Sequence, residues 1–145
     1  MLKTERGFSL LELMIVVAVI GILSSIAYPA YVDNVRRSRI ADATSELATR
    51  RVQMEQFLQD NRTYVGAPAC AAPAAIKSAA DTFDFSCSVL TAATYTLEAN
   101  GKAAMDGFDF AIDQNNVRST QIAGVGGGWD AVSATCWIRG KGGAC

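Results

Sequence analysis

Apolar residues fill one continuous stretch near the start of the chain. Residues 8–31 contain a single charged side chain, Glu12. About twenty helical residues span the hydrocarbon core of a bilayer, so this stretch predicts a membrane-spanning helix. A secretory signal peptide fits poorly, because the apolar run is too long and no A-x-A-like cleavage site lies where one would be expected.

The pattern becomes amphipathic after residue 31. Apolar positions at three- and four-residue steps predict that residues 32–61 continue as a helix with one buried stripe. Asn61 and the following Gly66 and Pro68 end this helix. Residues 62–82 have no clear period, so we expect a connecting loop there. The members of the stripe are Ile40, Ala43, Leu47, Met54, Phe57 and Leu58.

Alternating apolar and polar positions predict strands in the last part of the chain, residues 83–145. The strand patterns cover residues 83–89, 95–97, 108–112 and 117–121, and turn residues separate them. With no helical pattern between them, they predict an antiparallel meander of about four strands. The fold class is therefore α+β, with the long helix packed on the sheet.

Composition argues against catalysis. The 145 residues include no histidine, which removes Ser-His-Asp and Cys-His nucleophiles and every histidine-containing metal site. We expect no enzymatic activity, cofactor or metal. Thirteen Lys and Arg residues against fourteen Asp and Glu give a formal charge of −1, so bulk charge does not favour nucleic-acid binding.

Four cysteines all follow the apolar stretch. Their wide spacing is unlike the two close pairs of a structural zinc site, so it indicates two disulfides and an oxidising compartment. Three pairings are open, and short loops favour Cys70 with Cys87 and Cys136 with Cys145. The cysteines place residues after the span outside the cytoplasm, although the flanking Lys and Arg residues slightly favour the opposite orientation.

Glu12 is the most informative residue. A carboxylate within an apolar span is costly and points to a functional role. It could also lie at the membrane boundary and reach water. A functional role needs a cation, and a free amino terminus created by cleavage after Gly7 would supply one.

Residues 6–17, Arg-Gly-Phe-Ser-Leu-Leu-Glu-Leu-Met-Ile-Val-Val, resemble the leader junction and N-terminal motif of type IV prepilins. The resemblance implies that prepilin peptidase cuts after Gly7 and methylates Phe8. It also implies that Glu12 neutralises the Phe8 amine of an adjacent subunit during assembly. Gly21 and Pro29 weaken a helix, and the resemblance implies that the segment between them melts when subunits leave the membrane.

The same resemblance divides the chain into five parts and supplies its partners. These parts are a leader (1–7), a membrane and polymerisation half-helix (8–31), an amphipathic half-helix (32–61), a variable loop (62–82) and a sheet with a disulfide-closed C-terminal loop (83–145). The resemblance supports the Cys136–Cys145 pair. The implied partners are other pilin subunits, prepilin peptidase, the pilus assembly platform and the inner membrane. The resemblance also implies that the subunit crosses the inner membrane once, with its N-terminus in the cytoplasm, before assembly. Afterwards it is part of a pilus on the cell surface.

Three functions are compatible with these features. The first is a structural pilin, major or minor, supporting adhesion, twitching motility or DNA uptake. The second is a minor pilin that binds extracellular DNA, because residues 51–57 and 63–66, and Asp113-Gln114 before Val117-Arg118, are similar to a subgroup of minor pilins with DNA-receptor relatives. The third is a type II secretion pseudopilin. Candidate DNA contacts are Lys77, Lys102, Arg118, Arg139 and Lys141, and convergence on one face would favour the second function.

Overall fold

The computed structural model describes residues 8–71 and 73–145. The chain divides into two compact units, Met1–Val35 and Arg36–Cys145. The predicted leader, residues 1–7 with Gly7, lies outside the described residues, as does residue 72 in the predicted loop.

Helix α1 runs from Leu10 to Asn61 and passes through Gly21 and Pro29 without interruption. Ser9 caps its first turn, since the Ser9 hydroxyl accepts a hydrogen bond from the Glu12 backbone N–H at 3.1 Å. All residues from 8 to 31 are exposed. Within the described part of the chain, α1 is the one helix long and apolar enough to cross a membrane.

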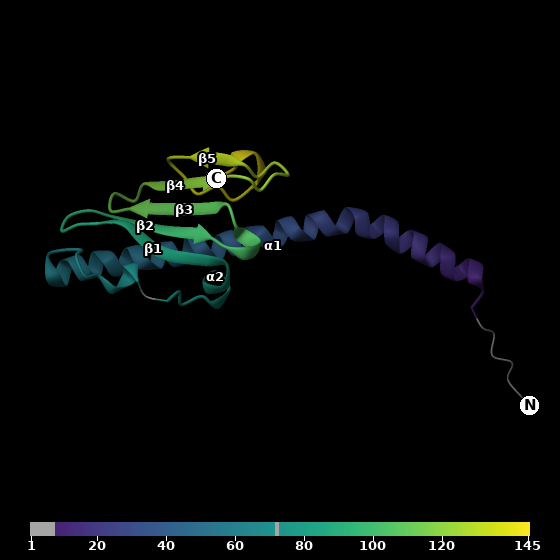
Figure 1. Cartoon of the computed structure of the whole chain (residues 1–145), viewed down its shortest axis with the longest axis horizontal. Coiled ribbons are helices and arrows are strands. Elements are labelled where there is room, and N and C mark those ends of the chain that lie inside the picture. The colour runs from purple at the N-terminus through teal and green to yellow at the C-terminus, as the bar shows by residue number, and fades with distance from the viewer. Residues whose placement is uncertain (1–7, 72) are drawn as a thin grey trace, which may run out of the picture. The chain divides into compact units, whose positions relative to one another are not determined.

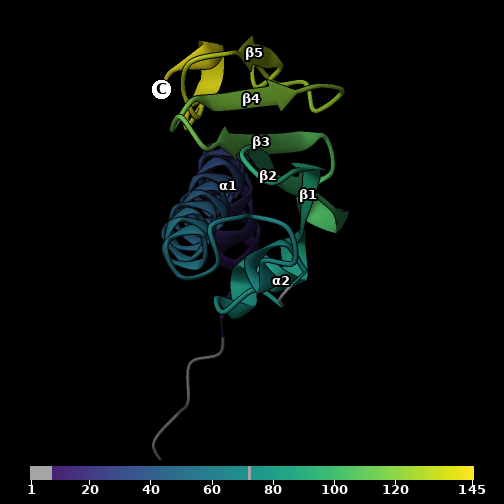
Figure 2. The same ribbon diagram turned by 90° about the vertical axis from the view of Figure 1, so that its left-hand side faces the viewer.

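The second unit, which we call the head, places an antiparallel sheet on the later part of α1 (Figure 1). Its strands pair in sequence order, and its first strand has a register shift between Cys87 and Val89. Figure 2 shows the sheet curving over α1, with the short helix α2 (Lys77–Thr82) beside the edge strand β1 (Phe83–Leu90). The strands are β1 (Phe83–Leu90), β2 (Tyr95–Gly101), β3 (Phe108–Asp113), β4 (Arg118–Ile122) and β5 (Ala131–Ser133).

The structure corrects two expectations. The sheet has five strands where about four were predicted, because the three-residue β5 is too short to show alternation. The predicted loop 62–82 contains a 3₁₀ turn, Pro68–Cys70, and helix α2, Lys77–Thr82. Six residues of helix are too few to reveal a period in an alanine-rich sequence.

The core lies between the predicted stripe of α1 and one face of the sheet. Ile40, Ala43, Leu47 and Met54 are completely buried, and Phe57 and Leu58 pack at the margin. Phe108, Phe110 and Ile112 alternate along β3 and face the helix. Burying each such side chain stabilises the head by about 1.5–3 kcal/mol, so the stripe largely determines how α1 lies on the sheet.

A buried ion pair fixes α1 to the connecting loop. Arg50 is 2% exposed; its Nε donates to Glu46 Oε1 at 3.1 Å and its Nη1 to the Ala69 carbonyl at 2.6 Å. The guanidinium also lies 4.7 Å from the centre of the Phe85 ring on β1. Glu46 Oε1 accepts a further bond from the Ala75 N–H. One pair of charges therefore holds together the helix, the loop and the first strand.

A second carboxylate fixes the far end of the head. Glu55 accepts hydrogen bonds from the hydroxyls of Tyr64 (3.1 Å) and Tyr95 (3.0 Å). Burial, and then the bonds to Glu55, raise the pKa of both phenols above their ordinary value. Both phenols remain neutral donors at physiological pH. Tyr95 holds the start of β2 on α1, and Tyr64 holds the beginning of the connecting loop on the same helix.

We expect Arg50→Met to lower the free energy of unfolding by about 3–5 kcal/mol, because it leaves Glu46 buried without its cation. The measurement is denaturant unfolding of the full chain in a nonionic detergent, followed by tryptophan fluorescence. Both tryptophans, Trp129 and Trp137, lie in the head.

The matched control is the double variant Glu46→Met/Arg50→Met, which removes both charges. It should recover part of the lost stability, since no unpaired buried charge is left. A double variant less stable than Arg50→Met would contradict this account of the pair.

Candidate functional site

The structure divides the five predicted DNA contacts between the two edges of the sheet. Lys77 begins α2, which leads directly into β1, and Lys102 follows β2 and donates its backbone N–H to the Thr82 carbonyl just before β1. Lys102 Nζ forms an ion pair with Asp84. Arg118 begins β4, while Arg139 and Lys141 follow β5. The five cations therefore do not converge on one face, and only the group at the β4–β5 side can form a joint site.

Arg118 and Arg139 line a groove between α1 and the C-terminal segment. The Arg118 guanidinium lies 4.7 Å from the centre of the Trp137 ring. The indole is itself fixed, because its Nε1 donates to the Ala111 carbonyl at 2.9 Å. The groove has a volume of about 350 Å³, and its remaining lining residues are Ala41, Thr44, Ser45 and Ala48 of α1. We call this site the basic groove.

The C-terminal segment is held in place by a side chain of β4. The Thr120 hydroxyl donates to the Cys136 carbonyl at 3.0 Å and accepts from the Ile138 N–H at 3.1 Å. A disulfide joins Cys136 to Cys145, and the N–H groups of Arg139 and Gly140 bond the Ala144 carbonyl. The segment is thus a closed loop fixed to the sheet, so Arg139 projects from an ordered backbone.

The chemistry of the basic groove suits an extended anion. Two guanidinium groups line it, and its described lining includes no carboxylate. Arginine presents a planar fork of donors that matches phosphate oxygens, and stacking on an indole limits the orientations of that fork. The α1 wall consists of small uncharged side chains, which leave room for a phosphate backbone to approach.

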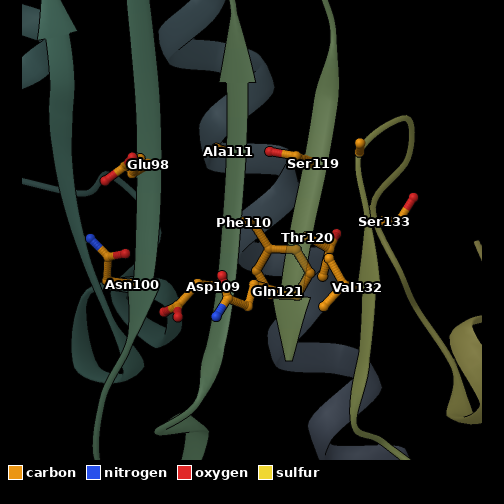
Figure 3. A pocket seen from close by; sticks show the side chains of 11 residues that line it. Glu98, Asn100, Asp109, Phe110, Ala111, Ser119, Thr120, Gln121, Val132 and Ser133 are labelled. Atoms are coloured by element: carbon orange, nitrogen blue, oxygen red, sulfur yellow. The ribbon is translucent and has the colours of Figure 1, made fainter. Parts of the chain in front are cut away.

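A second hollow, on the sheet face opposite α1, has the opposite chemistry. Figure 3 shows Glu98 and Asn100 on β2, Asp109 on β3 and Gln121 on β4 around it. It encloses about 370 Å³, and its described lining includes two carboxylates and no Lys or Arg. We call this surface the outer face. It repels phosphates, so the larger hollow is the poorer candidate for nucleic acid.

The remaining predicted residues lie as follows. Phe8 precedes α1 and Glu12 lies in its first turn. A second disulfide joins Cys70 to Cys87, which connects the 3₁₀ turn to β1. Among the described residues, no group of three or more His, Cys, Asp or Glu side chains could hold a metal ion.

Two family models match this sequence. One, described as the prokaryotic N-terminal methylation motif, covers residues 2–28. The other, described as the type IV minor pilin ComP, DNA uptake sequence receptor, covers residues 29–109, more than half of the chain. The chain belongs to this family of type IV minor pilins. The pilin fold and the absence of an enzymatic role in the family agree with the sequence-based expectations.

The similar proteins include fimbrial proteins of two bacteria. The chain is 41% identical over 64 residues to a fimbrial protein of Pseudomonas aeruginosa, covering 44% of this pilin and 42% of that protein. It is 46% identical over 65 residues to a probable minor fimbrial protein of Dichelobacter nodosus, covering 45% and 41%. The match therefore spans about two fifths of the length of these relatives.

The crystal structure of the non-core minor pilin PilV of Neisseria meningitidis shares the fold. The TM-score is 0.53 at 13% identity, over 65% of this pilin and 94% of that chain. The family match ends at residue 109, before Arg118, Trp137 and Arg139. The two arginines and the indole of the basic groove therefore lie outside the matched range, whereas its α1 wall lies within it.

Sequence reasoning identified the two arginines but not what brings them together. Thr120 and the small residues of α1 were missed, because exposed alanines and a single threonine carry no pattern. The Arg118–Trp137 contact has no local signal either, since 18 intervening residues separate its partners. The disulfide-closed loop was the one hint that Arg139 would have a fixed position.

Proposed function

We propose that this type IV pilin is a minor subunit that captures extracellular DNA through the basic groove. The single observation that carries the proposal is the convergence of Arg118 and Arg139 beside Trp137, on a groove whose described lining is free of carboxylates. The family is described by its DNA-receptor role, which supports this function over that of a bulk structural subunit. A type II pseudopilin role gains no such support.

Charge distribution supports the same proposal. The formal charge of the chain is −1, so attraction to DNA must come from a local group of cations. At physiological ionic strength charges are screened beyond about 8 Å. DNA at the basic groove would therefore respond mainly to the nearby Arg118 and Arg139, since the described lining of the groove holds no carboxylate.

We also propose how the subunit reaches the filament. Prepilin peptidase cuts after Gly7 and methylates Phe8 while the subunit spans the inner membrane with a cytoplasmic N-terminus. The Glu12 carboxylate then pairs with the Phe8 amine of a neighbouring subunit at the assembly platform. The segment between Gly21 and Pro29 melts as the subunit leaves the membrane for the surface pilus. A carboxylate in the first turn of an exposed apolar helix supports this role for Glu12.

Arg118→Ala/Arg139→Ala should weaken DNA binding and flatten its salt dependence. Each lost phosphate contact reduces the slope of log K against log salt by about one. The measurement is fluorescence anisotropy of a labelled duplex with the full chain in nonionic detergent, across a salt series.

The matched control is Lys77→Ala/Lys102→Ala, which removes the same charge at the opposite edge and should leave the slope unchanged. Equal weakening by both pairs would contradict the assignment to the basic groove. A wild-type chain that does not bind the duplex would contradict the function itself.

Glu12→Ala should still be cut after Gly7 and methylated on Phe8, yet be depleted from filaments. Without the carboxylate, the terminal amine is buried among apolar helices with no partner. Mass spectrometry of the N-terminal peptide reports processing, and its amount in sheared filaments reports assembly. Ser24→Ala, in the same apolar segment, is the control. Wild-type amounts of Glu12→Ala in filaments would contradict the proposed charge pair.

A further inference from the structure

The turn between β3 and β4 is a rigid hairpin tip. Asp113 Oδ1 accepts hydrogen bonds from the N–H groups of Asn115 (2.9 Å) and Val117 (2.8 Å). The Asp113 carbonyl accepts from Asn116 N–H at 3.0 Å, and its N–H donates to the Val117 carbonyl at 3.1 Å. One residue therefore binds the backbone of the whole turn. Figure 1 shows this turn at the left end of the sheet.

The tip exposes three side chains that the fold does not use. Asn115 and Asn116 are exposed, and within the described residues their amide groups have no hydrogen-bond partner. Val117 is 48% exposed. Gln114 differs, because its Oε1 accepts a hydrogen bond from the Tyr95 N–H at 3.2 Å. The Gln114 amide oxygen is thus occupied by a bond within the head, whereas the amides of Asn115 and Asn116 can bind a ligand.

The tip is continuous with the basic groove. Val117 is followed directly by Arg118, whose guanidinium lies on Trp137 in that groove. A phosphate bound by Arg118 would bring the adjacent part of the duplex to the hairpin tip. The major groove is about 12 Å wide and admits a two-stranded β-ribbon.

We propose that the β3–β4 tip reads A·T base pairs in the major groove of the DNA that the basic groove holds. An asparagine amide can donate to adenine N7 and accept from adenine N6, and an apolar side chain can contact the thymine methyl group. Asn115 and Asn116 supply the amides, and Val117 the apolar contact. This inference rests on the proposed function and assigns sequence reading, which the family description already names, to particular residues of the tip.

The test is selection from a random duplex pool by the full chain in nonionic detergent. The wild type should enrich a motif containing A·T pairs. Asn115→Ala/Asn116→Gly should lose the preference at those positions, a loss of about 5- to 150-fold in discrimination for each bidentate pair. Glycine is chosen at position 116 because the φ of Asn116 is +61° and alanine would be strained there. Asn100→Ala, on the outer face, is the matched control and should keep the motif.

Modified bases separate the two kinds of contact. In the selected duplex, 7-deazaadenine removes the N7 acceptor. It should weaken DNA binding by the wild type but not by the asparagine variant. Uracil in place of thymine removes the methyl group. This change should lower the affinity of the wild type for the duplex more than it lowers the affinity of Val117→Ala.

Three results decide the outcome. If the asparagine variant selects the same motif as the wild type, the inference is overturned. If the wild type binds DNA but selects no motif, the inference is also overturned, while the proposed function stands. A wild-type chain that binds no duplex overturns both.

Discussion

Burial of the Glu46–Arg50 pair is the constraint on which the head depends. An arginine inside a small domain is tolerated only where its donors are satisfied, and here the partners come from the helix itself and from the loop. Because those partners belong to different segments, satisfying one charge fixes the helix, the loop and β1 together. With α1 placed on the sheet by its buried stripe and tied to the loop and β1 by this pair, its wall of small residues lines the basic groove together with Arg118 and Arg139. The Cys70–Cys87 disulfide reinforces the same junction.

The head separates its charges by surface. Guanidinium groups gather where the C-terminal loop meets α1, whereas Glu98 and Asp109 lie on the opposite side of the sheet. A chain with a formal charge of −1 can attract DNA only through such a separation, since the attraction must be local. Under the proposed function, the outer face disfavours non-productive binding, and the duplex lies at the basic groove and the adjoining β3–β4 tip.

The sequence predicted the fold well where a periodic pattern of apolar residues extends over a long segment. The buried stripe from Ile40 to Met54 and four of the strands follow directly from alternation and helical spacing. Helix α2 and strand β5 were missed, because six and three residues are too short to carry a period. The candidate site was only partly predictable. Arg118 and Arg139 could be named as cations, but their convergence depends on Thr120 and Trp137, which act through contacts between distant segments.

The most direct test of the central claim, that DNA lies in the basic groove, is site-specific photocrosslinking. Ser45→Cys in the groove wall and Ser86→Cys on the outer side of β1 place a benzophenone label on exposed positions of opposite surfaces. With a radiolabelled duplex and the full chain in nonionic detergent, crosslinking should occur from position 45 and fall with added salt, while position 86 stays at background. Crosslinking from position 86 that equals or exceeds that from position 45 would contradict the account.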